Sequence, residues 1–393
     1  MQISQKSKYI LSTILIIVVI ELISTLSRKA GYEGRELVFY LRWLGIITII
    51  SICGFRSRLE WIKNLTLSIV SVSVVLLLVD FIFFVIIVIK LPAKTTKAYP
   101  ETASFVEQDH NLGYVPLADT SINVQEKYDT LTVYNIRFTT DKYHRRINPF
   151  DTSKSKNRYA LFFGCSITFG EGVNDSETIP SRFSYYLPAY HSYNFGFSGY
   201  GTQQMLANFQ NRDIKHQITE KEGIGIYTFI NPHINRAIGD MQVYDSWGAN
   251  MPYYHIKGDS LFRNGSFKTG RWFISGIYTL LGRSSLLKYY KINFPLHLKE
   301  RHFMLVTKMI KESYNRYVSK FGNTNFYVII FPGEQPDIVP YLMKQHIKVL
   351  DYSKLFNRTS KGNSYLPFDG HPRPVADDIF AKQLSSDIKK LLP

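Results

Sequence analysis

Three polar residues in two glycine-containing turns have the types needed for nucleophilic chemistry. The segment "FFGCSITFGEG" carries Ser166 directly after an apolar run, and "FDGHPRP" near the end of the chain carries Asp369 and His371. A serine hydroxyl becomes a nucleophile when a histidine removes its proton and a carboxylate holds that histidine in the useful tautomer. The sequence therefore predicts Ser166 as the nucleophile, His371 as its base and Asp369 as the residue that orients the base.

Two further segments offer hydrogen-bond donors for the negative charge that such a reaction develops. "NFGFSGYGTQQ" places Gly199 after one short predicted strand, and "YTFINPHINR" places Asn231 at the tip of the next. The backbone N–H groups of Gly199 and Ser166 and the side-chain amide of Asn231 are the predicted donors of an oxyanion hole.

Strands and helices alternate along the part of the chain that carries these residues. This alternation predicts a mostly parallel five-stranded sheet with helices on both faces. Ligands of such sheets bind beyond the carboxyl ends of the strands, where Ser166 is expected. Asp175 and Thr178 are expected to cap the helix that follows the serine turn. The predicted strands are 159–165, 193–197, 225–230, 326–331 and 347–350, and the predicted helices are 178–187, 202–210, 298–321 and 375–392.

The blocks "GCSITFG", "FSGYGTQQ", "FINPH" and "FDGHP" resemble, in chain order, the four blocks of the SGNH (GDSL-type) hydrolases. The resemblance runs from about residue 159 to the C-terminus. It implies a three-layer α/β/α sandwich for residues 151–393, a Ser166–His371–Asp369 triad, and Gly199 and Asn231 as oxyanion donors. It does not account for the first ninety residues.

Two positions depart from the family's pattern. Only Gly370 separates the aspartate and histidine of the last block, where the family usually has two residues, so Asp351 is kept as a second candidate for orienting the base. The first block reads Gly-Cys-Ser instead of Gly-Asp-Ser. Cys165 could itself be a nucleophile, but we interpret it as a small buried residue because neighbours in a strand point in opposite directions.

Three apolar stretches, at about 9–26, 38–55 and 65–89, precede the hydrolase-like region. A membrane-spanning helix needs roughly 20 mostly apolar residues, so three spans are predicted. Glu21 and Asp80 are costly in lipid and are expected to contact another helix or to lie near a helix end. With the N-terminus inside, five flanking Lys or Arg residues lie inside and six outside, which leaves the orientation open. Residues 91–150 are predicted to be a linker and a small β-rich lead-in with a strand at 130–139.

The composition of the chain favours some classes of protein and argues against others. The chain has 393 residues, 45% of them hydrophobic, and a net charge of +16. This charge suits an anionic membrane surface or an acidic polymer, and the sequence has neither a nucleic-acid-binding motif nor a dense basic run. With two cysteines, Cys53 and Cys165, neither a disulfide framework nor a cysteine metal cluster is predicted. No cofactor is expected.

An aromatic-rich insertion at about 237–297 interrupts the alternation. Aromatic rings stack on sugars, so Trp247 and Trp272 are candidate substrate-binding residues, although such rings equally often pack a long excursion of the chain. His233 lies two residues after Asn231 and is a further candidate for substrate contact or for a structural role. Arg236 could bind a substrate carboxylate or form an internal salt bridge.

These features together predict a membrane-anchored serine esterase or O-acyl (acetyl) hydrolase or transferase that acts on acylated glycans through an acyl-serine intermediate. The glycan, the multi-pass location in a bacterial cell membrane and an extracytoplasmic catalytic domain rest on the resemblance to membrane-tethered SGNH enzymes. A non-catalytic glycan-binding or polysaccharide-assembly subunit with the same fold is the alternative, and a lipid esterase is a further one.

Overall fold

A computed structural model describes residues 35–90, 95–98, 105–152, 156–356 and 364–392. The chain divides into two compact units. Residues 1–93 and 276–296 form one unit, and residues 94–275 and 297–393 form the other. We name them the anchor unit and the catalytic unit after the roles proposed for them below. The second segment of the anchor unit lies within the aromatic-rich insertion, which the sequence had not associated with the N-terminal helices.

Two helices of the anchor unit are long and apolar enough to cross a membrane: α2, Arg35–Phe55, and α3, Glu60–Lys90. They include the predicted spans at 38–55 and 65–89. The predicted first span, at about 9–26, and Glu21 lie outside the described residues, so the described chain holds two of the three predicted spans. Asp80 of α3 accepts a hydrogen bond from Tyr40 Oη of α2 at 2.9 Å, which confirms that it contacts another helix.

The catalytic unit contains the predicted five-stranded parallel sheet, in the order β12–β11–β8–β6–β7. Its strands are β6 Arg158–Phe163, β7 Tyr190–Asn194, β8 Glu222–Phe229, β11 Phe326–Ile330 and β12 Lys348–Asp351. The second predicted strand, at 193–197, is displaced: β7 starts and ends three residues earlier. Phe195 and Phe197 are buried from the loop that follows it, so their apolar character belongs to the core and not to a strand.

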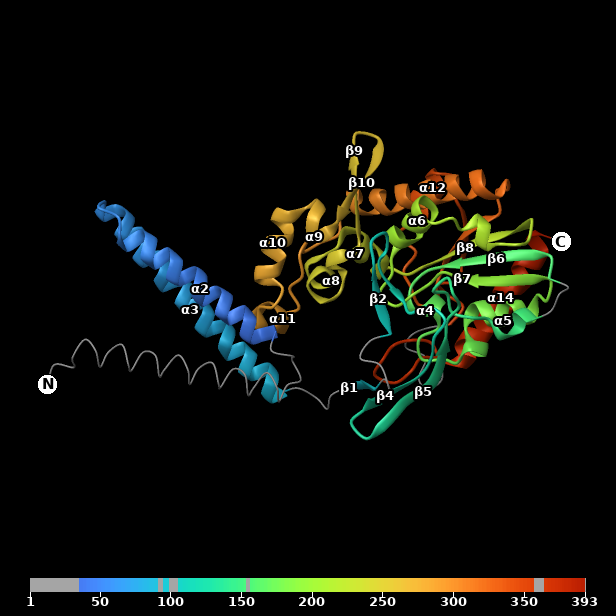
Figure 1. Cartoon of the computed structure of the whole chain (residues 1–393), viewed down its shortest axis with the longest axis horizontal. Coiled ribbons are helices and arrows are strands. Elements are labelled where there is room, and N and C mark those ends of the chain that lie inside the picture. The colour runs from blue at the N-terminus through green and yellow to red at the C-terminus, as the bar shows by residue number, and fades with distance from the viewer. Residues whose placement is uncertain (1–34, 91–94, 99–104, 153–155, 357–363, 393) are drawn as a thin grey trace. The chain divides into compact units, whose positions relative to one another are not determined.

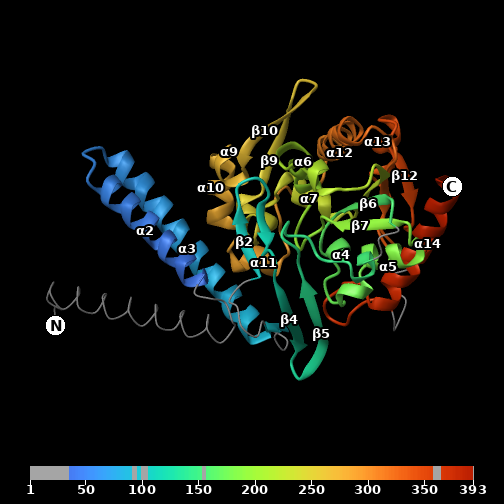
Figure 2. The same cartoon turned by 45° about the vertical axis from the view of Figure 1, so that its right-hand side comes forward.

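Helices cover both faces of the sheet, which gives three layers (Figures 1 and 2). Alternate residues of β6 enter two separate cores: Tyr159, Leu161 and Phe163 enter one, and Ala160 and Phe162 the other. Burial on both faces explains why this strand reads as a continuous apolar run. The first core is covered by α6 Thr202–Asn211, α7 Pro232–Ile238, α12 Glu300–Phe321 and α13 Val339–Lys344, and the second by α5 Ile179–Tyr186 and α14 Pro374–Leu391.

The β-rich lead-in packs against the segment that follows the predicted nucleophile. A third core joins its residues Val124, Ile136 and Phe138 to Phe169 and Phe197, which follow β6 and β7. The strand predicted at 130–139 is present as β5. The lead-in consists of the antiparallel strands β1 Thr95–Ala98, β4 Ser121–Tyr128 and β5 Leu131–Thr139, and of the hairpin β2 Val106–Asp109 and β3 Gly113–Pro116.

The aromatic-rich insertion is folded throughout. It contains the antiparallel hairpin β9–β10 and a series of short helices. The elements are α8 Met241–Ser246, β9 Pro252–Lys257, β10 Ser260–Ser266, α9 Phe267–Gly270, α10 Trp272–Leu281 and α11 Ser285–Tyr289. Short 3-10 helices are η1 Pro149–Thr152, η2 Asp175–Glu177, η3 Lys215–Gln217 and η4 Gly248–Asn250.

Candidate active site

The turn after β6 places Ser166 at the carboxyl edge of the sheet. β6 ends at Phe163, and Ser166 is the first residue of the short helix α4, Ser166–Phe169. A Cβ added at Gly164 would lie 2.1 Å from Thr168 Oγ1, so the backbone approaches α4 too closely for any larger residue. The Ser166 side chain opens only slightly to solvent, since the residue is 7% exposed.

The last sequence block forms a compact turn before α14. Gly370 adopts a left-handed φ of +81°, which glycine accepts without steric cost, and its N–H donates to the Leu366 carbonyl at 3.3 Å. The Leu366 N–H in turn donates to the His371 carbonyl at 2.8 Å. This turn brings Asp369 Oδ1 within 2.8 Å of His371 Nδ1. The single residue between aspartate and histidine is therefore compatible with their pairing.

The structure brings Ser166, His371 and Asp369 into one hydrogen-bonded chain. His371 Nε2 lies 2.8 Å from Ser166 Oγ, and Nδ1 faces the Asp369 carboxylate. In the tautomer that satisfies both contacts, Nδ1–H donates to Asp369 and Nε2 accepts from the serine hydroxyl. Asp351, the second candidate for orienting the base, instead accepts from the Ser353 N–H at 2.9 Å. It caps a local turn and has no part in this chain.

The predicted oxyanion donors follow the two strands that flank β6. β7 and β8 are the neighbours of β6 in the sheet, and Gly199 follows β7 while Asn231 follows β8. All three segments therefore emerge at the same edge of the sheet. The backbone N–H of Asn231 donates to Glu334 Oε2 at 2.8 Å, so Glu334, which follows β11, holds this residue in place. Glu334 is not among the site residues predicted from the sequence.

Tyr114 and Trp247 hold the loop that carries Gly199. The Tyr114 hydroxyl donates to the Ser198 carbonyl at 2.7 Å, and Trp247 Nε1–H donates to the Gly199 carbonyl at 3.3 Å. Burial raises the pKa of Tyr114, so its hydroxyl stays a neutral donor. Gly199 has a left-handed φ of +78°. The exposed Trp247, a predicted substrate-binding residue, thus lies beside the loop predicted to bind the oxyanion.

A second carboxylate lies near the histidine. Glu171 Oε2 is 3.9 Å from His371 Nε2 and accepts a hydrogen bond from Ser198 Oγ at 2.5 Å. The backbone N–H of Glu171 donates to the Ser166 carbonyl, so the nucleophile's own turn positions it. A negative charge at this place favours the imidazolium that forms when His371 takes a proton. Glu171 lies in the segment "FFGCSITFGEG", but it is not among the site residues predicted from the sequence.

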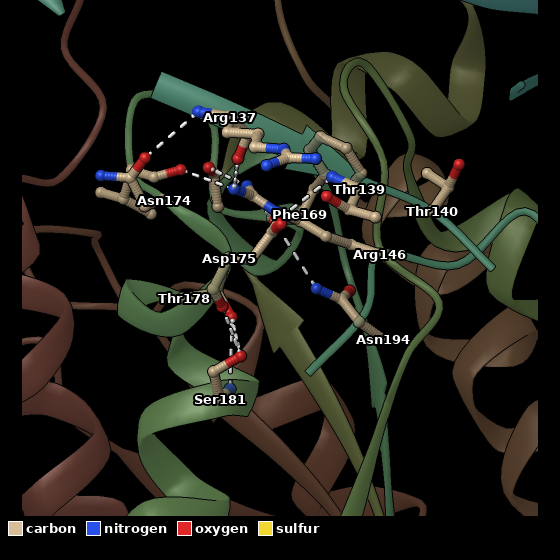
Figure 3. Close-up of polar contacts among 12 residues, drawn as sticks. Arg137, Thr139, Thr140, Arg146, Phe169, Asn174, Asp175, Thr178, Ser181 and Asn194 are labelled. Carbon is tan, nitrogen blue, oxygen red and sulfur yellow. Dashed lines mark hydrogen bonds and ion pairs between the residues drawn. The ribbon is translucent and has the colours of Figure 1, made fainter. Parts of the chain in front are cut away.

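Arg146 ties the lead-in to the nucleophile's turn (Figure 3). Its Nε–H donates to Asp175 Oδ1 at 2.8 Å, and its guanidinium is buried. Burial lowers the pKa of Arg146, and the adjacent Asp175 opposes that shift. Its remaining N–H groups donate to the carbonyls of Arg137, Phe169, Gly170 and Val173. The sequence offered no signal for this role, because the partners are mostly backbone carbonyls of distant segments.

Asp175 and Thr178 have different roles from each other. Thr178 Oγ1 accepts from the Ser181 N–H at 3.2 Å and caps α5, as predicted. Asp175 does not cap that helix: its carboxylate binds Arg146 and accepts from the Thr139 N–H (Figure 3).

Three other candidate residues, His233, Arg236 and Cys165, are held by contacts within the protein. His233 is fully buried, and its Nδ1 lies 2.8 Å from the Tyr227 hydroxyl, so it is out of reach of a substrate. Burial, with Arg236 nearby, lowers the pKa of His233 well below its usual value. Arg236 donates to the Tyr200 carbonyl at 2.7 Å. Cys165 is fully buried in the second core, which agrees with its interpretation as a packing residue.

Trp272 is not part of the cluster around Ser166. It lies at the start of α10, 74% exposed, with its ring edge-on to Phe273. The contacts to Ser166, His371 and the Gly199 loop described above come from other residues. Its exposure is a feature of α10 and is considered below.

The described residues contain no group of three or more His, Cys, Asp or Glu side chains placed to hold a metal ion. What they contain is a hydroxyl, an imidazole and a carboxylate in series at the carboxyl edge of a parallel sheet. This arrangement can activate the hydroxyl for attack on an acyl carbon.

No family model matches the chain, and no curated protein matches it. Similar solved structures include a member of the lipolytic G-D-S-L family from Veillonella parvula, with 13% identity and a TM-score of 0.35 over 60% of this chain and 100% of that chain. An acetyl xylan esterase from Butyrivibrio proteoclasticus has 12% identity and a TM-score of 0.37 over 61% of this chain and 66% of that chain. A family two carbohydrate esterase from Clostridium thermocellum, in complex with cellohexaose, has 10% identity and a TM-score of 0.35 over 61% and 66% of the two chains. At these identities and TM-scores, the similarity does not assign a function to this chain.

Proposed function

We propose that the chain is a membrane-anchored serine esterase of the SGNH type that transfers acyl groups through an acyl-Ser166 intermediate. The observation that carries the proposal is the continuous hydrogen-bonded chain from Ser166 Oγ through both nitrogens of His371 to Asp369. Its position at the carboxyl edge of the parallel sheet, beside Gly199 and Asn231, supports the same conclusion.

The geometry supports a two-step reaction. His371 Nε2 takes the proton as Ser166 Oγ attacks the ester carbonyl carbon, and Asp369 stabilises the imidazolium that results. The N–H groups of Ser166 and Gly199 and the amide of Asn231 stabilise the oxyanion. The C–O bond to the alcohol then breaks, and His371 gives the alcohol its proton. In the second step, His371 removes a proton from water or an acceptor hydroxyl, which attacks the acyl-serine and releases Ser166.

An acylated glycan is the proposed substrate. A cavity of about 620 Å³ in the catalytic unit is lined largely by polar side chains, including Gln108, Asn111 and Asn250. Amides of this kind hydrogen-bond the hydroxyl groups of sugars. Gly113 also lines this cavity, and the adjacent Tyr114 binds the Ser198 carbonyl next to Gly199. The exposed ring of Trp247 offers a stacking surface for a sugar beside Gly199.

Helices α2 and α3 are the proposed membrane anchor. Each has a mostly apolar stretch long enough to cross the hydrocarbon layer, and most side chains in these stretches are not buried by other protein. A multi-pass location in a bacterial cell membrane with an extracytoplasmic catalytic unit remains part of the proposal.

The proposal is tested with the full-length protein in detergent and 4-nitrophenyl acetate as substrate. We expect release of 4-nitrophenol by the wild type and loss of that activity in Ser166→Ala. Cys165→Ala is the matched control, because Cys165 is the adjacent residue and is fully buried; its activity should persist. Equal rates for the wild type and Ser166→Ala would refute the esterase and favour a binding subunit.

Labelling of Ser166 with a charged, membrane-impermeant fluorophosphonate in intact and permeabilised cells tests the location. Labelling in intact cells supports an extracytoplasmic catalytic unit, and labelling only after permeabilisation would refute it.

A further inference from the structure

Part of the aromatic-rich insertion belongs to the anchor unit. Residues 276–296 cluster with the N-terminal helices, although about 190 positions separate them from α3 in the chain. The boundary between the two units falls within α10. The chain therefore leaves the catalytic unit in α10 and returns to it at His297, so the insertion is a second connection to the anchor.

A carboxylate in the middle of an apolar helix makes the contact. Asp80 of α3 is 5% exposed and accepts hydrogen bonds from the backbone N–H groups of Ser285 at 3.2 Å and Leu286 at 3.0 Å. It also accepts from the Ser284 hydroxyl and from Tyr40 Oη. An ionised side chain within an apolar span is costly unless it is hydrogen-bonded, and here the N-terminus of α11 supplies donors. Asp80 thus fixes the start of α11 against α3.

The position of Asp80 along α3 gives the depth of this contact. Asp80 follows Glu60, the first residue of α3, by twenty residues. At 1.5 Å per residue this is about 30 Å, which is the thickness of the hydrocarbon layer. If the charged end of α3 near Glu60 lies at one membrane surface, Asp80 lies close to the other. α11 then lies near that surface, at a level of α3 that is about 15 Å before its last residue, Lys90.

The exposed side chains of the α10–α11 segment, defined here as residues 272–291, suit such a boundary. On α10, Trp272 and Phe273 are 74% and 65% exposed, and Ile277 is 39% exposed. At the end of α11, Tyr289 and Tyr290 are also exposed, and their rings pack against Phe83 of α3. Tryptophan and tyrosine are enriched at membrane–water boundaries. An apolar helix of ten residues is too short to span the hydrocarbon layer, and an interfacial segment is one of the structures that fits this length.

The charges of the segment point to anionic lipid. Residues 272–291 contain Arg283, Lys288 and Lys291 and no Asp or Glu, and no acidic residue occurs anywhere in 260–299. Lys288 and Lys291 are exposed. Basic side chains near a membrane surface are attracted to anionic lipids. A cavity of about 290 Å³ beside Asp80, lined by Phe39, Trp43, Leu77 and Leu281 among others, offers an apolar space next to the segment.

We infer that the α10–α11 segment is an interfacial membrane element, which inserts its apolar side chains at the boundary of an anionic bilayer and is docked on the spanning helices by Asp80. This inference rests on the proposed membrane anchor. It assigns the lipid surface, and not a glycan, to Trp272 and its neighbours on α10.

Spin labels on single cysteines in the full-length protein, reconstituted in phosphatidylcholine vesicles that contain phosphatidylglycerol, test the inference. Cys53 is exposed and is first replaced by serine, whereas Cys165 is fully buried and remains. Ile277→Cys is the test position, Val75→Cys on α3, 58% exposed, is the lipid reference, and Phe262→Cys on β10, 46% exposed, is the aqueous reference. Collision with oxygen, which concentrates in lipid, is compared with collision with a neutral, water-soluble nickel chelate.

We expect the label at Ile277, like that at Val75, to favour oxygen, and the label at Phe262 to favour the nickel chelate. If Val75 reports lipid while Ile277 behaves like Phe262, the interfacial element is refuted and the anchor stands. If Val75 also reports water, the anchor itself is refuted. None of these outcomes depends on the esterase activity, so the two proposals fail separately.

Two further arms separate the contributions of Asp80 and of lipid charge. Asp80→Leu, with a label at Ile277, should raise collision with the nickel chelate severalfold, and Asp80→Asn should raise it less because its amide oxygen can still accept from the α11 N–H groups. Unchanged accessibility in Asp80→Leu would refute the docking role. Without phosphatidylglycerol, the Ile277 label should become more accessible to the chelate, and equal accessibility in both vesicles would refute the role of the basic residues. A thermal unfolding transition like that of the wild type shows that each variant is folded.

Discussion

Gly199→Ala tests whether the Gly199 loop stabilises the transition state. A Cβ at this position would lie 2.4 Å from Tyr114 Oη and 2.7 Å from Trp247 Nε1, whereas ordinary contacts begin at 3.4 Å. The loop must therefore move by about 1 Å (3.4 minus 2.4 Å) unless Tyr114 moves, and Tyr114 is hydrogen-bonded to the Ser198 carbonyl of this same loop. A misplacement of about 1 Å in a catalytic group can lower the rate roughly a hundredfold.

The expected result is a fall in kcat of about a hundredfold, which corresponds to about 2.7 kcal/mol of transition-state stabilisation. KM should change little, because the oxyanion forms only in the transition state. The left-handed backbone also destabilises an alanine by roughly 1–2 kcal/mol. Steady-state kinetics with 4-nitrophenyl acetate and thermal unfolding in detergent measure the two effects separately.

Gly322→Ala is the matched control for backbone strain. Gly322 ends α12 with a φ of +71°, close to the +78° of Gly199, and a Cβ there would meet no atom within 4 Å. We expect a similar loss of stability and an unchanged kcat. If folded Gly199→Ala keeps the kcat of the wild type, or loses no more than Gly322→Ala does, Gly199 has no part in oxyanion stabilisation.

Three further predictions concern the base, a buried histidine and the arginine behind the nucleophile's turn. Asp369→Asn should lower kcat roughly a thousandfold or more because the imidazole loses its orienting carboxylate. Asp351→Asn should have the kcat of the wild type in the same ester assay. A large loss of kcat in Asp351→Asn, with none in Asp369→Asn, would make Asp351 the residue that orients the base. Burial lowers the pKa of His233, so below about pH 6.5 the unfolded chain binds a proton that the folded chain does not. As the pH falls below this value, the free energy of unfolding should decrease by up to about 1.4 kcal/mol per pH unit. In thermal unfolding between pH 5 and 8 (roughly the titration range of histidine), His233→Asn should weaken this dependence, and an identical pH profile would contradict it. Arg146→Lys should lower the free energy of unfolding by about 3 kcal/mol or more, because lysine cannot reproduce the buried guanidinium's contacts with Asp175 and several carbonyls. Chemical denaturation measures this change, and a stability equal to that of the wild type would contradict the prediction.

Local patterns in the chain were sufficient to predict the sheet and the three residues that form the Ser166–His371–Asp369 hydrogen-bonded chain. A strand buried on both faces must be apolar along its length, as "RYALFF" is, and a sharp turn after it needs glycine, as at Gly164. The Asp369–Gly370–His371 sequence is also a local feature, because one short turn brings the carboxylate to the imidazole. The pattern is wrong at β7, because the apolar residues Phe195 and Phe197 fill the core from a loop and not from a strand.

The residues that hold the site in place could not be predicted in this way. Arg146 and Tyr114 act through backbone carbonyls of other segments, and a carbonyl has no sequence signature. Asp80 is visible in the sequence as a misplaced charge, yet its partners at Ser285 and Leu286 lie more than two hundred residues away. Residue types and periodicity constrain what each segment can do, because they act over a few neighbours. Which distant segments meet depends on how all the apolar faces are buried at once, and this emerges only when the whole chain has folded.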